Sequence, residues 1–208
     1  MNVDIVYLAI VLVVVLFSMV IHELAHGYVA YILGDDTAKK MGRLTLNPIK
    51  HVDPFLTVIL PISLALVGAP VFGGAKPVLF NPNNIKNEEW GVALVAISGP
   101  IINFLIAFVS FGLWSFTMPE NEIVNQVFAS LVYVNLGFFV FNLIPLPPLD
   151  GSRVLYAFAP DFVRDFMKKI ESFSIWILFA ILILANSFVI RLIGAVVNWF
   201  VVLFGDVF

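Results

Sequence analysis

The stretch 5–33, IVYLAIVLVVVLFSMVIHELAHGYVAYIL, is apolar over most of its length and carries a cluster of ionisable side chains at His22, Glu23 and His26. A helix needs about 20 predominantly apolar residues to cross a bilayer, so this stretch is long enough to span one. Ionisable groups at membrane depth are costly to bury and are therefore candidates for function. The stretch predicts a membrane helix with a functional site inside it.

The cluster has the pattern H-E-x-x-H, in which two histidines stand four residues apart. Residues at i and i+4 of a helix lie on the same face, one above the other, so both imidazoles can bind one metal ion. The glutamate between them lies beside that ion and can take a proton from a water that the metal activates. The pattern predicts His22 and His26 as metal ligands and Glu23 as the general base.

The composition is that of an integral membrane protein. Of the 208 residues, 61% are hydrophobic and 12% are charged, with a mean hydropathy of +1.03, whereas soluble domains carry about 25% charged residues. The chain has no cysteine, so zinc ligands must come from His, Asp or Glu. The net charge of −3 indicates no nucleic-acid partner. Asp4 stands where a signal peptide has basic residues, so we expect the first apolar run to be retained as a helix.

Three further apolar runs of spanning length follow. Two of them cover 92–118 and 123–144. The third covers 172–204 and is interrupted by Asn186 and Arg191, so it is either one long kinked helix or two shorter ones. These runs predict an all-α polytopic membrane protein with a bundle of four to six transmembrane helices.

The stretch 54–72 is apolar but contains three prolines and a glycine, so it either spans the membrane or forms a re-entrant segment. The segments 42–46 and 76–80 could form short β-strands. We expect the whole chain, 1–208, to form a single intramembrane domain.

Charge distribution favours the re-entrant alternative. Ten of the eleven Lys and Arg residues lie in the segments 34–53, 73–90 and 145–171. Basic loops are retained in the cytoplasm, and all three can lie there only if 54–72 does not cross once. The N-terminus is then outside, the loop 34–53 is inside, and the first helix runs in the same direction as 123–144. This topology predicts an active site toward the cytoplasmic side.

A third metal ligand is needed, because catalytic zinc has three protein ligands and a water. Asp150 stands out among the acidic residues because it follows the run 123–144 and the proline-rich stretch 145–149, and it precedes Gly151. Prolines restrict the backbone and so fix the direction of the next side chain. In the predicted topology Asp150 and the two histidines lie toward the same ends of their helices. The alternative role for Asp150 is to cap the helix that begins near Ser152.

Together these residues make the chain resemble the site-2 protease family of intramembrane zinc metalloproteases, in a minimal form without a PDZ or CBS domain. The resemblance rests on H-E-x-x-H at 22–26, on N-x-x-P-x-x-x-L-D-G at 142–151, and on G-P-x-x-N at 99–103. The segment 42–54 is similar to a minimal bacterial or archaeal branch. The family often has Asp-Gly-Gly where this chain has Asp-Gly-Ser at 150–152.

Three further polar residues, Asn142, Asn103 and His51, each have more than one possible role. The resemblance places Asn142 near the metal, where it could donate a hydrogen bond to the developing oxyanion or could pack between helices. For Asn103 packing is favoured over a role in the substrate site. His51 is expected to have a structural role in a loop rather than to bind metal.

Two pairs of residues indicate how the helices pack and where they end. Gly99 and Gly137 are expected to allow close approach of helices. Trp90 and Trp114 suit the ends of a membrane helix.

The resemblance implies an intramembrane endopeptidase with one Zn²⁺ per chain that cleaves transmembrane proteins in or near their helices. The expected location is the cell membrane of a prokaryote, with the lipid bilayer as surroundings. Two alternatives remain. A metal transporter or sensor would use the same ligands without needing Glu23, and a non-catalytic scaffold would bind membrane helices without a buried base.

Overall fold

The structure is a computed structural model that describes residues 4–54, 59, 76, 78–184 and 186–208. Within these residues it is helical, with no β-strand. The helices, in chain order, are α1 (Ile5–Ile32), α2 (Thr37–Lys40), η1 (Pro48–Lys50), η3 (Pro82–Asn84), α4 (Glu88–Thr117), α5 (Glu122–Asn142), α6 (Asp150–Phe158), α7 (Asp161–Glu171), α8 (Ser174–Leu184) and α9 (Asn186–Val207).

Four helices in the described part of the chain are long and apolar enough to cross a membrane: α1, α4, α5 and, over Ser187–Val207, α9. The prediction of an all-α polytopic membrane protein is therefore confirmed. The run 172–204 forms two helices, α8 and α9. Helix α8 has 11 residues and a length of about 16 Å, which is too short to span a bilayer alone.

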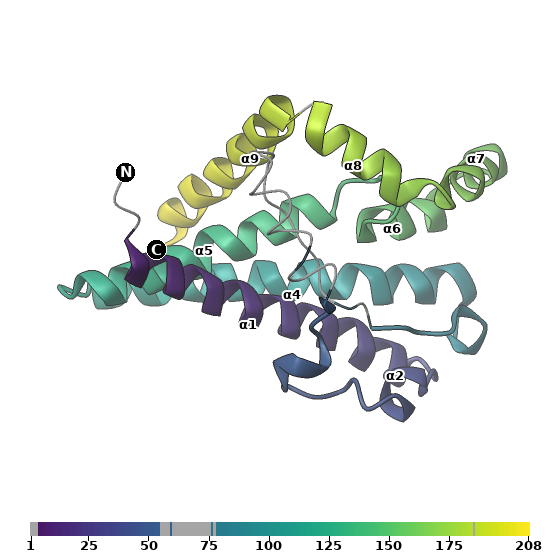
Figure 1. Ribbon diagram of the computed structural model, residues 1–208, viewed down its shortest axis with the longest axis horizontal. Coiled ribbons are helices and arrows are strands. Elements are labelled where there is room, and N and C mark those ends of the chain that lie inside the picture. Colours follow the sequence, from purple (N-terminus) through teal and green to yellow (C-terminus); the bar gives the residue numbers. More distant parts are fainter. Residues whose placement is uncertain (1–3, 55–58, 60–75, 77, 185) are drawn as a thin grey trace.

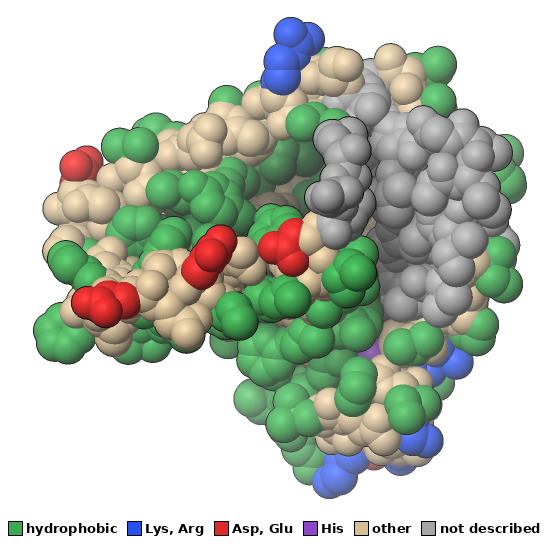
Figure 2. Space-filling view, turned by 60° about the vertical axis from the view of Figure 1, so that its left-hand side comes forward, with side chains coloured by type: hydrophobic (Ala, Val, Ile, Leu, Met, Phe, Trp, Pro, Cys, Tyr) green, Lys and Arg blue, Asp and Glu red, His purple; other side chains and the backbone are tan. Residues whose placement is uncertain are grey.

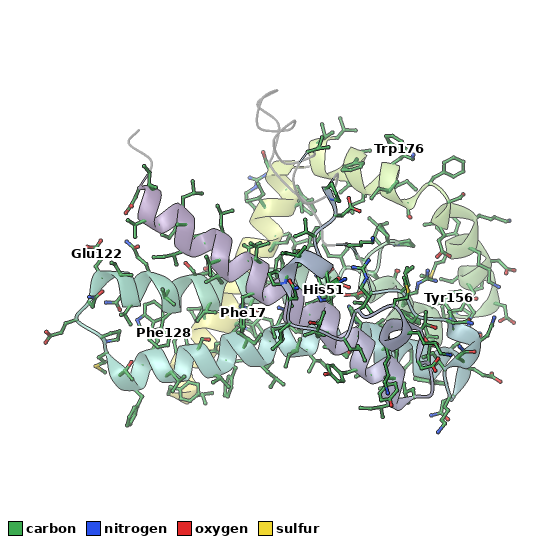
Figure 3. The ribbon with its side chains drawn as sticks, turned by 60° about the horizontal axis from the view of Figure 1, so that its bottom comes forward. Phe17, His51, Glu122, Phe128, Tyr156 and Trp176 are labelled. Atoms are coloured by element: carbon green, nitrogen blue, oxygen red, sulfur yellow. The ribbon has the colours of Figure 1, made fainter. Side chains whose placement is uncertain are left out.

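Helices α1 and α5 run in the same direction, and α4 runs in the opposite one (Figure 1). Both chain termini lie at one end of the bundle, and α2, α6 and α7 lie at the other (Figure 1). Figure 3 shows the same separation, with Glu122 of α5 at one end and Tyr156 of α6 at the other. The predicted common direction of the first helix and 123–144 is thus the one observed.

Helix α4 is the centre of the packing, because it contacts α1, α5, α6 and α9. Between α4, α5 and α9 lies a core of five buried side chains surrounded by phenylalanines. Phe204 is its largest member, and its ring lies 5.2 Å from that of Phe108 and 5.6 Å from that of Phe104, both in edge-on contact. Edge-on aromatic pairs add to the free energy gained by burial, so this core fixes α9 against α4.

The outer surface suits contact with lipid. Large hydrophobic side chains are exposed along α1, α4 and α9. Figure 2 shows one face of the molecule on which acidic side chains are few, most of the Lys and Arg side chains gather at the lower end, and hydrophobic and uncharged areas cover much of the rest that is coloured by type. Such a surface is unfavourable in water and favourable in a bilayer.

The strand expected at 42–46 does not form, and the re-entrant segment expected at 54–72 lies mostly outside the described residues. The segment 42–46 forms turns rather than a strand, because the N–H groups of Gly42 and Arg43 bond back to Lys39 and Ala38 at the end of α2. Gly42 has φ +65°, a conformation that breaks an extended strand. Most of the stretch 54–72, predicted to be re-entrant, lies outside the described residues, and the described residues 76 and 78–80 have no strand pairing.

Candidate metal centre

Three predicted ligands from two helices converge at one point. His22 and His26 lie on α1, and Asp150 is the first residue of α6. The Nε2 atoms of His22 and His26 lie 3.1 Å and 3.4 Å from Oδ2 of Asp150, and 3.1 Å from each other. Within the described residues this is the one group of His and acidic side chains with metal-site geometry. Both histidines are buried and Asp150 is half-buried.

The other nitrogen of each imidazole is held by an acceptor. Nδ1 of His22 lies 2.6 Å from Oδ1 of Asn103, and Nδ1 of His26 lies 2.8 Å from the carbonyl oxygen of Val95. A carbonyl oxygen can only accept, so both Nδ1 atoms carry the hydrogen and donate. Each Nε2 atom then presents a lone pair toward the shared point, which is the arrangement that metal-ligating histidines adopt.

The point between the two Nε2 atoms and Oδ2 of Asp150 is electronegative and suits a cation. Two imidazole lone pairs and a carboxylate oxygen face one another, and they repel unless a positive charge lies among them. Among the described residues, the buried Oδ2 atom of Asp150 has no hydrogen-bond donor. Two nitrogens and one carboxylate oxygen are a ligand set that suits catalytic zinc and leaves a fourth position open. The residues present therefore fit the metal that the pattern predicts.

The loop between α5 and α6 directs Asp150 toward the histidines. Helix α5 ends at Asn142, and the proline-containing segment 143–149 leads into α6. A Cβ at Gly151 would lie 2.3 Å from the carbonyl oxygen of Leu143, so only glycine fits there. Asp150 makes no capping hydrogen bond, and Leu149 occupies the N-cap position. The alternative role for Asp150 as a helix cap is thus not the one that the structure shows.

Gly99 on α4 lies directly against the imidazoles. A Cβ at this position would come within 2.5 Å of His26 and 2.6 Å of His22. The expectation of close approach at Gly99 is confirmed. For Gly137 the described residues show no such approach, because none of their atoms lies within 4 Å of a Cβ built there.

Glu23 lies beside the ligands and has a backbone partner. Its Oε2 atom accepts a hydrogen bond of 2.7 Å from the N–H of Val78, fifty-five residues away in the chain. Glu23, His26 and Asp150 line one cavity of about 330 Å³, whose remaining walls come from 78–82, α4, α6 and Pro148 in the loop before α6. The carboxylate is therefore placed where a substrate and a water molecule could reach it.

A buried polar network lies behind His22. Nδ2 of Asn103 donates to Oδ1 of Asn135 on α5 at 2.7 Å, and Nδ2 of Asn135 donates to Oγ of Ser18 at 2.9 Å. All three side chains are fully buried. The bonds of Asn103 to α1 and α5 agree with the expected packing role, and its contact with His22 is an additional one that the sequence does not indicate. Single polar residues within apolar runs, such as Ser18 four residues before His22, are the signal that could have revealed the network.

The remaining polar candidates contact groups other than the three ligands. Nδ2 of Asn142 donates to the carbonyl oxygen of Phe138 on its own helix. His51 is fully buried, and its Nε2 atom lies 2.8 Å from the carbonyl oxygen of Thr45, which agrees with the expected loop role (Figure 3). Trp90 and Trp114 lie in the first and last turns of α4.

Comparisons with known proteins identify the family. The model of peptidase family M50 matches residues 10–120 and 116–185, which include all three metal-site residues and Glu23. The chain is 42% identical over 184 residues to the Bacillus subtilis protein named "Putative zinc metalloprotease YwhC", which covers 85% of this chain and 79% of that protein.

Two more distant relatives carry the same description. Rip2 of Mycolicibacterium smegmatis is 31% identical over 67% of this chain and 53% of its own length. MJ0611 of Methanocaldococcus jannaschii is 32% identical over 47% of this chain and 50% of its own length. No solved structure gave a significant match. The chain belongs to peptidase family M50 and is a zinc metalloprotease.

Proposed function

We propose that this protein is an intramembrane endopeptidase that hydrolyses peptide bonds in or near the transmembrane helices of other membrane proteins. The observation that carries the proposal is the depth of the site. His26 lies six residues before the end of α1 at Ile32, a rise of about 9 Å along the helix. A metal centre built on α1 would therefore lie below the membrane surface, where the available peptide bonds belong to membrane segments.

In the proposed mechanism His22, His26 and Asp150 hold one zinc ion per chain. When bound, zinc polarises a peptide carbonyl and lowers the pKa of a water molecule. Glu23 accepts the proton of the attacking water through its carboxylate and later gives it to the leaving nitrogen. Asn103 and the carbonyl of Val95 keep both imidazoles oriented during this cycle.

Asn142 is the residue proposed to donate a hydrogen bond to the oxyanion. Its side-chain amide bonds to Phe138 on its own helix, so it would have to turn toward the substrate. This assignment rests on the family resemblance and on the position of Asn142 at the end of α5, eight residues before Asp150, where α6 begins.

The substrate must open before it is cut, because a helix keeps its carbonyls in backbone hydrogen bonds. The segment 78–80, which has no regular secondary structure, forms one wall of the cavity next to Glu23. We propose that it receives the opened substrate by backbone pairing, which leaves side-chain recognition to the cavity. The lining includes Phe80, Val92 and Ala96, which favours apolar substrate side chains.

The proposed location is the cell membrane of a prokaryote, with the active site toward the cytoplasm. Support comes from the basic residues of α2, α6 and α7, since these helices lie together at the end of the bundle that carries the metal centre. The relatives named above come from bacteria and an archaeon.

The test is cleavage of single-span membrane proteins in liposomes by wild type and Glu23→Gln, with zinc content measured on both. We expect about one zinc per chain in both proteins and a loss of cleavage of about 10²- to 10⁴-fold in the variant. Glu122→Gln is the matched control, because Glu122 is exposed at the opposite end of the bundle. Equal cleavage by Glu23→Gln would refute the proposed base. Zinc transport without cleavage by either protein would indicate a transporter instead.

A further inference from the structure

Asp35 is a fully buried carboxylate that lies outside the metal centre. It follows the end of α1, and its side chain accepts four hydrogen bonds. Oδ1 receives the hydroxyl of Thr37 at 2.6 Å, the N–H of Thr37 at 3.3 Å and the side-chain amide of Asn84 at 2.9 Å. Oδ2 receives the N–H of Asn81 at 2.8 Å. Burial by itself raises the pKa of the carboxyl, but these hydrogen bonds outweigh it and hold the pKa below its usual value.

Two of these donors belong to one segment, residues 78–86, which we call the strap. Its far end is fixed to the end of α1, since the N–H of Lys86 donates to the carbonyl oxygen of Leu33 at 2.9 Å. Gly34 has φ +110°, and a Cβ there would lie 3.2 Å from the carbonyl oxygen of Asn84. The backbone at Leu33 and Gly34, just after α1, therefore packs closely against the strap.

The near end of the strap reaches Glu23. Val78 donates its N–H to the Glu23 carboxylate, and its buried side chain lies 3.1 Å from the position that a Cβ of Gly27 would take. Asp35 holds the strap at Asn81, three residues from that contact. The strap thus links the buried carboxylate of Asp35 at the end of α1 to the carboxylate of Glu23 beside the metal ligands.

We propose that Asp35 is a positioning residue: it clamps the strap so that the Val78 N–H orients the Glu23 carboxylate and the strap keeps its place as a wall of the substrate cavity. The proposal rests on the proposed role of Glu23. A buried charge is unfavourable unless it is fully hydrogen-bonded, and charge-assisted hydrogen bonds are stronger than neutral ones. Removing the charge leaves buried donors without an adequate acceptor.

The variant that tests the clamp is Asp35→Asn. It keeps the side-chain size but replaces one accepting oxygen of the carboxylate with the donating NH2 of an amide. Asp36→Asn is the matched control, because Asp36 is the neighbouring acid and its ion pair is with Lys40 on the same short helix. Asn84→Ala removes one donor from the strap side and serves as a second variant, since the side chain of Asn84 is exposed apart from this bond.

Three quantities are measured on each protein in detergent: zinc affinity, kcat and KM for a cleaved substrate, and hydrogen exchange of the peptide that contains 78–86. For Asp35→Asn we expect faster exchange in the strap, kcat lower by about tenfold or more, and unchanged zinc affinity. We expect the same direction and a smaller change in Asn84→Ala, and no change in Asp36→Asn.

Two results would overturn the clamp. One is wild-type exchange and wild-type kcat in Asp35→Asn. The other is a loss of zinc affinity as large as the loss of kcat, because Asp35 would then support the fold of the metal centre as a whole. If the wild-type protein cleaves no substrate, the proposed function fails, and strap exchange in Asp35→Asn still decides whether Asp35 holds the strap.

Discussion

The two sides of the metal centre are supported in different ways. Behind His22, the side chains of Asn103, Asn135 and Ser18 form a fully buried network that joins α1, α4 and α5. In front, Glu23 is held by one backbone N–H from the strap, which in turn is held by Asp35. The network can change only if spanning helices move, whereas the strap can change by local opening of a loop. We therefore expect changes in the network to alter metal binding and changes in the strap to alter proton transfer by Glu23.

The largest expected effect comes from removing a ligand. Asp150→Ala leaves two imidazole lone pairs facing each other with two protein ligands in place of three. We expect zinc binding to fall below stoichiometric levels and cleavage to fall to background. Zinc content after dialysis and the cleavage assay check this, with the exposed Asp161→Ala as control. Full zinc content in Asp150→Ala would mean that another residue completes the site.

A methyl group at Gly99 on α4 should displace the imidazoles of His22 and His26, which lie directly against this position. The added Cβ of Gly99→Ala would lie 2.5 Å from His26, so the imidazoles must shift. We expect zinc affinity to fall by about 10- to 100-fold, as for changes that misorient a ligand. Gly137→Ala is the matched control, since its Cβ meets no described atom within 4 Å. Equal zinc affinities in the two variants would contradict the observed closeness of α4 to the histidines.

Loss of the acceptor for His22 should act mainly on metal binding. In Asn103→Leu the Nδ1–H of His22 loses its partner, and Asn135 loses a donor. We expect zinc affinity to fall by about 10- to 100-fold, with a smaller fall in Asn135→Leu, which acts through Asn103. A chelator competition titration measures both. Asn125→Leu, which breaks a bond to Trp114 near the far end of α4, should leave zinc affinity unchanged.

The smallest expected effect is a change with pH in the stability that Asp35 contributes by holding the strap. The folded-state pKa of Asp35 is lowered, so its contribution to stability is present above the usual value of 3.8 and is lost as the pH falls through the lower folded value. We expect the difference in Tm between wild type and Asp35→Asn to be largest near neutral pH and to shrink as the pH falls below 3.8. A difference in Tm that is constant with pH would contradict the assignment.

The sequence alone was sufficient for the parts of the molecule that follow from local pattern. The spanning helices α1, α4 and α5 come from apolar runs, and the pairing of His22 with His26 comes from helical spacing. The meeting of these histidines with Asp150 required the topology argument as well, because the two segments lie more than a hundred residues apart.

The parts that could not be predicted depend on contacts between distant segments. No periodicity indicates that Val78 donates to Glu23, or that Asp35 accepts from Asn81. The segment 42–46 has strand-like residues, but its N–H groups are used by the end of α2, so tertiary context outweighed propensity. A single asparagine in an apolar run does not indicate which neighbour it will contact, so the bond of Asn103 to His22 could not be predicted.

The central claim is that zinc is held by two imidazoles and one carboxylate inside the bundle. X-ray absorption spectroscopy at the zinc edge of the loaded protein tests it most directly, with wild type, His51→Ala and Asp150→Ala compared. We predict two imidazole ligands and oxygen ligands at about 2.0–2.2 Å, with the same spectrum in His51→Ala. A third imidazole that disappears in His51→Ala, or a spectrum that is unchanged in Asp150→Ala, would contradict the account.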